Sequence, residues 1–147
     1  MRKSLLIALA VALAAPCLAN AATPAENKKI VTDFFTLGFS QKHIRDAFMK
    51  YVDPGYIQHN PIAKDGRDNA IAALEPFLNG SPGYSYEIKR VLADGDLVAV
   101  HGWGRMNATD RGQAIVDIVR LKDGKIVEHW DVIQAIPEKS ANDHPMF

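Results

Sequence analysis

The chain has 147 residues, of which 48% are hydrophobic and 23% charged, a balance typical of one globular domain. Its 17 basic residues equal its 17 acidic ones, and no basic run exceeds two residues, which argues against nucleic acid as a partner. Cys17 is the only cysteine, so the sequence excludes a disulfide within the chain.

The first 21 residues have the features of a secretory signal. A short basic start and an apolar run over 5–15, too short to span a membrane, precede an Ala-Asn-Ala cleavage pattern at 19–21. We therefore predict a signal peptide over 1–21 and an exported, periplasmic or secreted protein. The mature chain, 22–147, would be one domain with no cysteine, and we expect no membrane partner after cleavage.

Two helices are predicted at the start of the mature chain. Thr23 and Glu26 form a capping-box pattern around Pro24, and apolar residues at helical spacing follow as far as Gly38. Ser40 is predicted to cap a second helix. The Asp-Pro-Gly triplet at 53–55 then breaks the helical pattern.

A third helix is predicted after an irregular segment over 56–67. It begins near Asp65 or Asp68 and carries apolar residues at helical spacing. Pro76 would remove one internal hydrogen bond, so we expect a kink or an early end there.

The second half of the chain changes to a period of two, which indicates β-strands. The segments 84–93, 97–106, 114–121 and 126–136 are rich in Val and Ile and are separated by turn sequences. Helices followed by hairpin-linked strands favour an α+β fold. We predict a cone-shaped α+β barrel, with the N-terminal helices packed on a strongly curved antiparallel sheet around a small-molecule pocket.

Histidines and aspartates alternate with apolar residues along the last three strands. His101 shares a face with Leu97 and Ala99, Asp117 with Ile115 and Val119, and His129 and Asp131 with Ile133. If all these faces turn inward, the four polar side chains meet in one cavity, and His59 joins them from the preceding loop. A carboxylate among apolar walls and a nearby histidine can perform acid/base catalysis.

Each of these residues, considered alone, could instead have a structural role. Asp117 or Asp131 could pair with an arginine, and His101 could be a hydrogen-bonded core histidine. A metal-ligand set is a further alternative, formed by His59, His101, His129 and Asp131. No specific metal motif is present, so we predict no metal ligands.

Several segments resemble the SnoaL-like polyketide cyclase family of the nuclear transport factor 2-like superfamily. They are the Tyr-Ile-Gln-His-Asn-Pro motif at 56–61, the segments 93–101 and 117–131, and the tail over 142–147. The resemblance extends from Asn27 to Phe147. It implies a cone of helices over a bent antiparallel sheet and acid/base chemistry without a cofactor. It also implies catalytic roles for His101, for Asp117 or Asp131, and for His59.

We therefore predict a cofactor-independent enzyme of the SnoaL-like type, acting on a small, mostly apolar carbonyl or hydroxyl compound. It would be an aldol-type cyclase, an isomerase or a dehydratase (a lyase). Asp117 or Asp131 would be the base, and His101 and His59 would polarise or protonate the oxygen. Candidates for substrate contacts are Tyr56, Asn60, Trp103 and His129.

The alternative is an exported binding or dimerisation module without catalysis, because one fold can carry many functions. It would keep the pocket but would need no tuned acid or base. A homodimer would bury the second face of the sheet, which carries Ile126, Trp130 and Val132.

Overall fold

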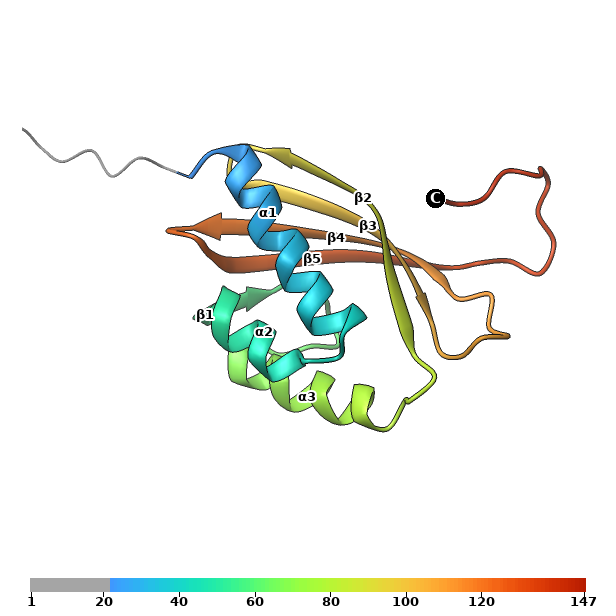
Figure 1. Ribbon diagram of the computed structural model, residues 1–147, viewed down its shortest axis with the longest axis horizontal. Helices are drawn as coiled ribbons and strands as arrows, with labels where there is room; N and C mark the ends of the chain where they lie inside the picture. The colour runs from blue at the N-terminus through green and yellow to red at the C-terminus, as the bar shows by residue number, and fades with distance from the viewer. Residues whose placement is uncertain (1–21) are drawn as a thin grey trace, which may run out of the picture.

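The computed structural model describes residues 22–147, so the predicted signal peptide lies outside the described residues (Figure 1). The elements in chain order are α1 (Pro24–Phe35), η1 (Thr36–Ser40), α2 (Ile44–Tyr51), β1 (Val52–Gln58), α3 (Arg67–Asn79), β2 (Ser85–Asp94), β3 (Leu97–Arg105), β4 (Gln113–Lys122) and β5 (Lys125–Ala135). Within 22–147, no helix combines the length and the hydrophobicity needed to cross a membrane.

The five strands form one mixed sheet in the order β1-β5-β4-β3-β2. Strands β2 to β5 pair antiparallel, as the sequence predicts. The prediction of a purely antiparallel sheet is wrong at one edge, where β1 pairs parallel to β5. Residues 56–58, which the sequence predicts as part of an irregular segment, belong to this strand.

The turn sequence at 53–55 explains why β1 is hard to recognise. The register of β1 against β5 shifts between Val52 and Ile57, across the Asp-Pro-Gly triplet. Proline cannot donate a ladder hydrogen bond, so it is tolerated on an edge strand or at a bulge. The strand then resumes at Ile57 and Gln58, and Gln58 pairs with His129 of β5.

The N-terminal helices follow the predicted caps only in part. Thr23 and Glu26 form the predicted capping box of α1. The prediction that Ser40 caps the second helix is wrong, because His43 occupies that position and the Ser40 hydroxyl donates to the Tyr86 carbonyl at 2.9 Å. Gly38 lies inside the π-helical turn η1, where a Cβ atom would lie 3.1 Å from that of Ala47. The turn therefore brings α1 and α2 close together.

Helix α3 continues to Asn79, three residues past Pro76, so the predicted early end is wrong. Pro76 falls in the last turn of the helix, where the loss of one hydrogen bond leaves the rest of the helix intact. Ala70, Ile71 and Leu78 are its buried residues.

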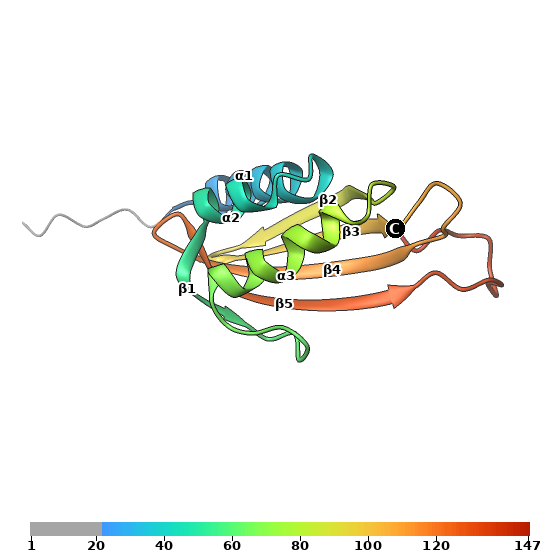
Figure 2. The same cartoon turned by 90° about the horizontal axis from the view of Figure 1, so that it is seen from below.

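The helices lie on one side of the sheet, which we call the inner face (Figure 2). Burial alternates along β3: Val98 and Val100 are fully buried beneath the helices, whereas Ala99 and His101 are half-buried on the opposite, outer face. The ladder then fixes the remaining strands, since Asp117 pairs with Val100 on one side and with Asp131 on the other. The α+β class and the helix-covered sheet predicted from the sequence are confirmed.

Candidate active site

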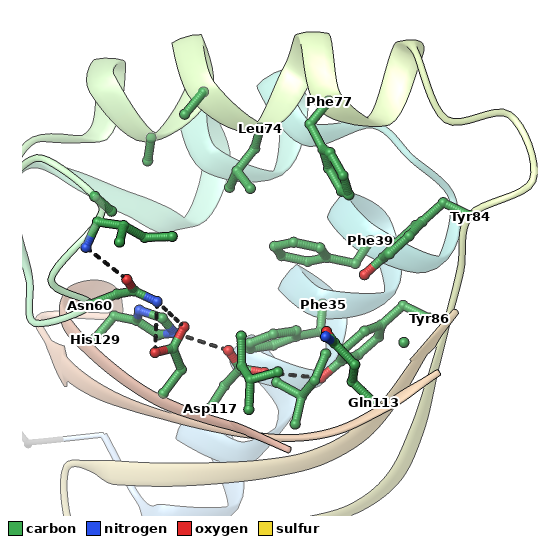
Figure 3. A pocket seen from close by; sticks show the side chains of 18 of the residues that line it. Phe35, Phe39, Asn60, Leu74, Phe77, Tyr84, Tyr86, Gln113, Asp117 and His129 are labelled. Carbon is green, nitrogen blue, oxygen red and sulfur yellow. Dashed lines mark hydrogen bonds and ion pairs between the residues drawn. The ribbon is translucent and has the colours of Figure 1, made fainter. Parts of the chain in front are cut away.

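A large cavity of about 700 Å³ lies between the inner face of the sheet and the helices (Figure 3). This volume suits a drug-sized ligand. Its walls are mainly apolar and include the aromatic residues Phe34, Phe35, Phe39, Phe48, Tyr56, Phe77, Tyr84 and Tyr86. Polar side chains enter it from β1, the loop that follows β1, β4 and β5. The predicted pocket is therefore present, and its lining is apolar with a few convergent polar groups.

Asp117 and His129 form a hydrogen-bonded pair in this cavity. Nε2 of His129 lies 3.0 Å from Oδ1 of Asp117, and both side chains are about nine-tenths buried, with exposures of 12% and 11%. Asp117 stands on β4 and His129 on the neighbouring β5, where Val119 is the ladder partner of His129. The pair is thus fixed by two central strands rather than by a loop.

Gln58 determines where the hydrogen sits on the His129 ring. The backbone N–H of Asn60 donates to Oε1 of Gln58 at 2.9 Å, which identifies that atom as the amide oxygen. Nδ1 of His129 lies 2.9 Å from the same oxygen and must therefore donate to it. Nε2 then shares a single proton with Asp117, and this proton can belong to either group. A pair of this kind can take up or release a proton with little movement.

Tyr86 completes the hydrogen bonding of Asp117 from β2. Its hydroxyl donates to Oδ2 of Asp117 at 3.1 Å. The pKa of Tyr86 lies well above its ordinary value, because burial, the charge of Asp117 and this hydrogen bond all favour the neutral phenol. The hydroxyl therefore stays a donor across the physiological pH range, so Tyr86 engages Oδ2 of Asp117 while His129 engages Oδ1.

Asp131 is held by the loop that follows β1. The Asn60 amide donates to both carboxylate oxygens of Asp131, at 2.9 and 2.8 Å. Oδ1 of Asn60 in turn accepts from the backbone N–H of Ile62 at 3.1 Å. Asn60 therefore fixes Asp131 beside the Asp117–His129 pair, with which it forms a compact polar centre.

Tyr84 offers a hydroxyl that no other described residue engages. Its ring packs edge-to-face on Phe77, with the centroids 5.6 Å apart, and its hydroxyl points into the cavity (Figure 3). Burial, with a contribution from the charge of Asp117, raises the pKa of Tyr84 to about 12. Tyr84 is therefore a neutral hydrogen-bond donor at pH 7, suited to an oxygen atom of a bound molecule.

The prediction that the His101 side chain points into the cavity is wrong. Its strand buries Val98 and Val100 in the core beneath the helices, on the inner face, so the His101 side chain lies on the outer face. There it packs edge-to-face on Phe147, with the ring centroids 6.1 Å apart. The apolar neighbours Leu97 and Ala99, which suggested an inward face, belong to this outer face as well.

His59 is also directed away from the cavity. Its Nε2 lies 2.8 Å from Oε1 of Glu128, and its ring stacks on Trp130 with the centroids 4.7 Å apart. Glu128 and Trp130 alternate with His129 and Asp131 along β5, so they occupy the outer face. His59 thus anchors the loop from outside, while its neighbour Asn60 reaches the polar centre.

The four candidates for substrate contacts divide in the same way. Tyr56, Asn60 and His129 line the cavity, and Tyr56 stacks on the His129 ring at 6.3 Å between centroids. Trp103 lies on the outer face, where its Nε1 donates to the Arg111 carbonyl at 2.8 Å. Its predicted contact with a substrate in the cavity is therefore not available.

The structure does not bring together the metal ligands considered from the sequence, which were His59, His101, His129 and Asp131. His59 and His101 lie apart from the other two, whereas Asp117, His129 and Asp131 each offer one atom within 4.8 Å of the others. Two carboxylates and one imidazole suit a divalent cation. The Asn60 amide and the Tyr86 hydroxyl already donate to the two carboxylates, and Nε2 of His129 already lies within hydrogen-bond distance of Asp117, which favours proton chemistry at the centre.

The outer-face position of His101 has a consequence for its titration. Partial burial, and secondly the positive charge of Arg90, lower the pKa of His101 below its ordinary value of 6.5. We expect its ring protons to titrate below pH 6.5 in an NMR experiment. Its contribution to stability should be complete above pH 6.5 and should decrease as the pH falls toward the folded pKa, because the unfolded chain binds the proton more tightly. A midpoint at or above 6.5 would contradict this assignment.

The sequence of residues 31–129, more than half of the chain, matches the profile of the SnoaL-like domain family. The chain therefore belongs to the SnoaL-like domain family. A comparison with curated proteins gave no significant match.

Solved structures share the fold at low sequence identity. A proposed SnoaL-like polyketide cyclase from a Jannaschia species is 24% identical, with a TM-score of 0.64 over 75% of this chain and 86% of that one. AclR, a proposed hydroxylase from Streptomyces galilaeus, is 22% identical, with a TM-score of 0.62 over 76% and 91%. A proposed isomerase of the SnoaL-like family from Agrobacterium tumefaciens is 14% identical, with a TM-score of 0.64 over 76% and 99%. These similarities establish the fold and leave the reaction open.

Proposed function

We propose that this protein is an acid/base enzyme that removes a proton from the carbon next to a carbonyl group in a small, mostly apolar substrate. The observation that carries this proposal is the Asp117–His129 pair, which shares one proton inside an aromatic cavity. Relatives with a similar fold are described as a polyketide cyclase and as an isomerase, and both reactions can begin with this proton transfer.

In this proposal the Asp117 carboxylate is the base, and the shared proton rests on Nε2 of His129. Asp117 accepts the proton from carbon on a lone pair that His129 and Tyr86 do not use. The electron pair of the C–H bond forms the new carbon–carbon double bond, and the π pair of the carbonyl moves onto its oxygen. A hydrogen bond from Tyr84 would stabilise that oxygen, since its phenol is neutral and otherwise unengaged. Returning the proton to another carbon gives an isomerase, attack on a second carbonyl gives a cyclase, and loss of a neighbouring hydroxyl as water gives a dehydratase.

Hydrogen–deuterium exchange tests the shared first step without knowledge of the natural substrate. The probe is 2-tetralone, a bicyclic ketone small enough for a 700 Å³ cavity, incubated with the protein in D₂O and followed by NMR. We expect the protons next to the carbonyl to exchange faster than in buffer alone, and we expect the exchange rate to saturate as the ketone concentration rises. If the ketone binds in the cavity and exchange stays at the buffer rate, the protein is a binding module instead.

We further propose that the protein is exported, on the basis of the signal features over 1–21. Expression of the complete chain in a bacterial host should give a periplasmic product that begins at Ala22. Mass spectrometry of the intact protein checks the cleavage site. A product that keeps Met1 and stays in the cytoplasm would contradict export.

A further inference from the structure

One end of the cavity carries two arginines that the proposed chemistry does not use. Arg105, at the end of β3, and Arg111, in the loop before β4, both line the cavity. Neither makes an ion pair within 4.0 Å among residues 22–147. Within the described part of the chain, the Arg111 side chain donates only to the Ile136 carbonyl, at a long 3.4 Å, and Nε of Arg105 is buried without a partner.

Trp103 contacts both arginines at the end of β3. Arg105 is the last residue of that strand, and it lies against both the outer-face Trp103 ring and the cavity. The Arg105 guanidinium stacks on the Trp103 ring, with Cζ 4.0 Å from the ring centroid. The same indole donates its N–H to the Arg111 carbonyl at 2.8 Å. Stacking restricts the plane of a guanidinium, which reduces the entropy lost when it binds a ligand.

The loop between β3 and β4 is firmly built. Asp110 accepts from the backbone N–H groups of Met106 and Gly112 at 2.8 and 2.9 Å. Gly112 has a φ of +82°, and a Cβ atom there would lie 2.2 Å from the Gly104 carbonyl oxygen and 2.6 Å from Cγ of Arg105. Only glycine fits this position, so the loop beside the two arginines has a defined backbone conformation.

We propose that Arg105 and Arg111 form an anion-binding subsite that takes the carboxylate of an otherwise apolar substrate. Guanidinium groups bind carboxylates through paired, charge-assisted hydrogen bonds. Asp110 is the nearby acid, and its oxygens are already engaged by backbone N–H groups, so two positive charges face one negative charge. The substrate would then span the aromatic walls, with its carboxylate at this loop and its reacting carbonyl at Asp117. This substrate class rests on the proposed function.

A matched pair of ligands tests the subsite by binding alone. The probes 2-naphthoate and 2-naphthamide have nearly the same shape and differ in charge. The wild-type protein should bind 2-naphthoate at least about ten-fold more tightly in titration calorimetry, as expected for a charge-assisted hydrogen bond. Arg111→Gln and Arg105→Gln should each remove most of that preference and leave the affinity for 2-naphthamide within about two-fold.

Two control variants separate the subsite from general electrostatic attraction. Lys122→Gln removes a charge at the exposed β4–β5 turn, and Lys64→Gln removes the third cation that lines the cavity. Both should keep the preference for the carboxylate. Equal affinity of the wild type for the two probes, or an equal loss in Lys64→Gln and Arg111→Gln, would overturn the proposal.

Failure of the subsite can be distinguished from failure of the proposed chemistry. The carboxylate preference does not require Asp117, so Asp117→Asn should retain it. A preference that persists in a protein without exchange activity would contradict only the proposed function. Exchange activity without any carboxylate preference would contradict only the subsite.

Discussion

Replacing Asp117 by asparagine is expected to lower the exchange rate of bound 2-tetralone by about 10²- to 10⁴-fold, the range attributed to a positioned acid or base. The amide cannot take up the proton that the Asp117 carboxylate removes from carbon. The change preserves shape, and the amide can still accept the Tyr86 hydrogen bond, so the cavity should remain. NMR in D₂O at saturating ketone gives the rate directly.

Asp123→Asn is the matched control for this variant. Asp123 lies in the exposed β4–β5 turn with a φ of +50°, a conformation that asparagine adopts readily. This variant makes the same chemical change away from the cavity and should keep the wild-type rate. If Asp117→Asn binds 2-tetralone and exchanges it at the wild-type rate, Asp117 is not part of the base.

Gly102→Ala is expected to destabilise the protein by about 1–3 kcal/mol and to disrupt the polar centre. Gly102 lies on β3 beneath the Tyr86 ring, and a Cβ atom there would lie 2.3 Å from the Tyr86 hydroxyl oxygen and 2.4 Å from Cζ. The ring would have to move, although it is wedged against Phe35 and hydrogen-bonded to Asp117. Chemical denaturation measures the stability, and the tetralone assay measures the loss of rate.

Two further variants identify the cause of that effect. Gly55→Ala adds the same methyl group at a position where the nearest atom to the new Cβ is Oδ1 of the flexible Asp53 side chain, at 3.3 Å. The stability of this variant should therefore differ little from that of the wild type. Tyr86→Phe keeps the ring and removes only the hydroxyl that donates to Asp117. If Gly102→Ala is as stable and active as the wild type, the Tyr86 ring does not occupy the position described.

The inward direction of Asp117, His129 and Asp131 could be predicted from the sequence, because alternation and two short turns define the last two strands. The same reasoning failed for β3. Its inner face carries Gly102 and Gly104, which have no side chain and so add nothing to the apolar pattern of that face. The outer face carries His101 among apolar neighbours. The glycines are inside because the Tyr86 and Ile115 side chains fill the space that a Cβ atom would need.

Gln58 and Tyr86 were missed for different reasons. Gln58 follows a turn signal, and nothing local shows that the chain resumes a strand beside β5, since that pairing is formed with residues about 70 positions later. Tyr86 reads as an ordinary strand aromatic in the sequence. The available signal was the glycine that faces Tyr86 on the neighbouring strand, because a glycine leaves room for a tyrosine ring to lie across the sheet. Such a ring can reach Asp117 with its hydroxyl.

The most direct test of the central claim is a crystal structure of the protein with 2-tetralone bound. We expect the ketone in the cavity, with its rings against Phe35 and Phe39. The carbon next to the carbonyl should lie beside the Asp117–His129 pair, and the carbonyl oxygen should accept a hydrogen bond from Tyr84, within about 2.6–3.2 Å. A ketone bound on the outer face near His101 or His59, or one whose carbonyl points away from Asp117, would contradict the central claim.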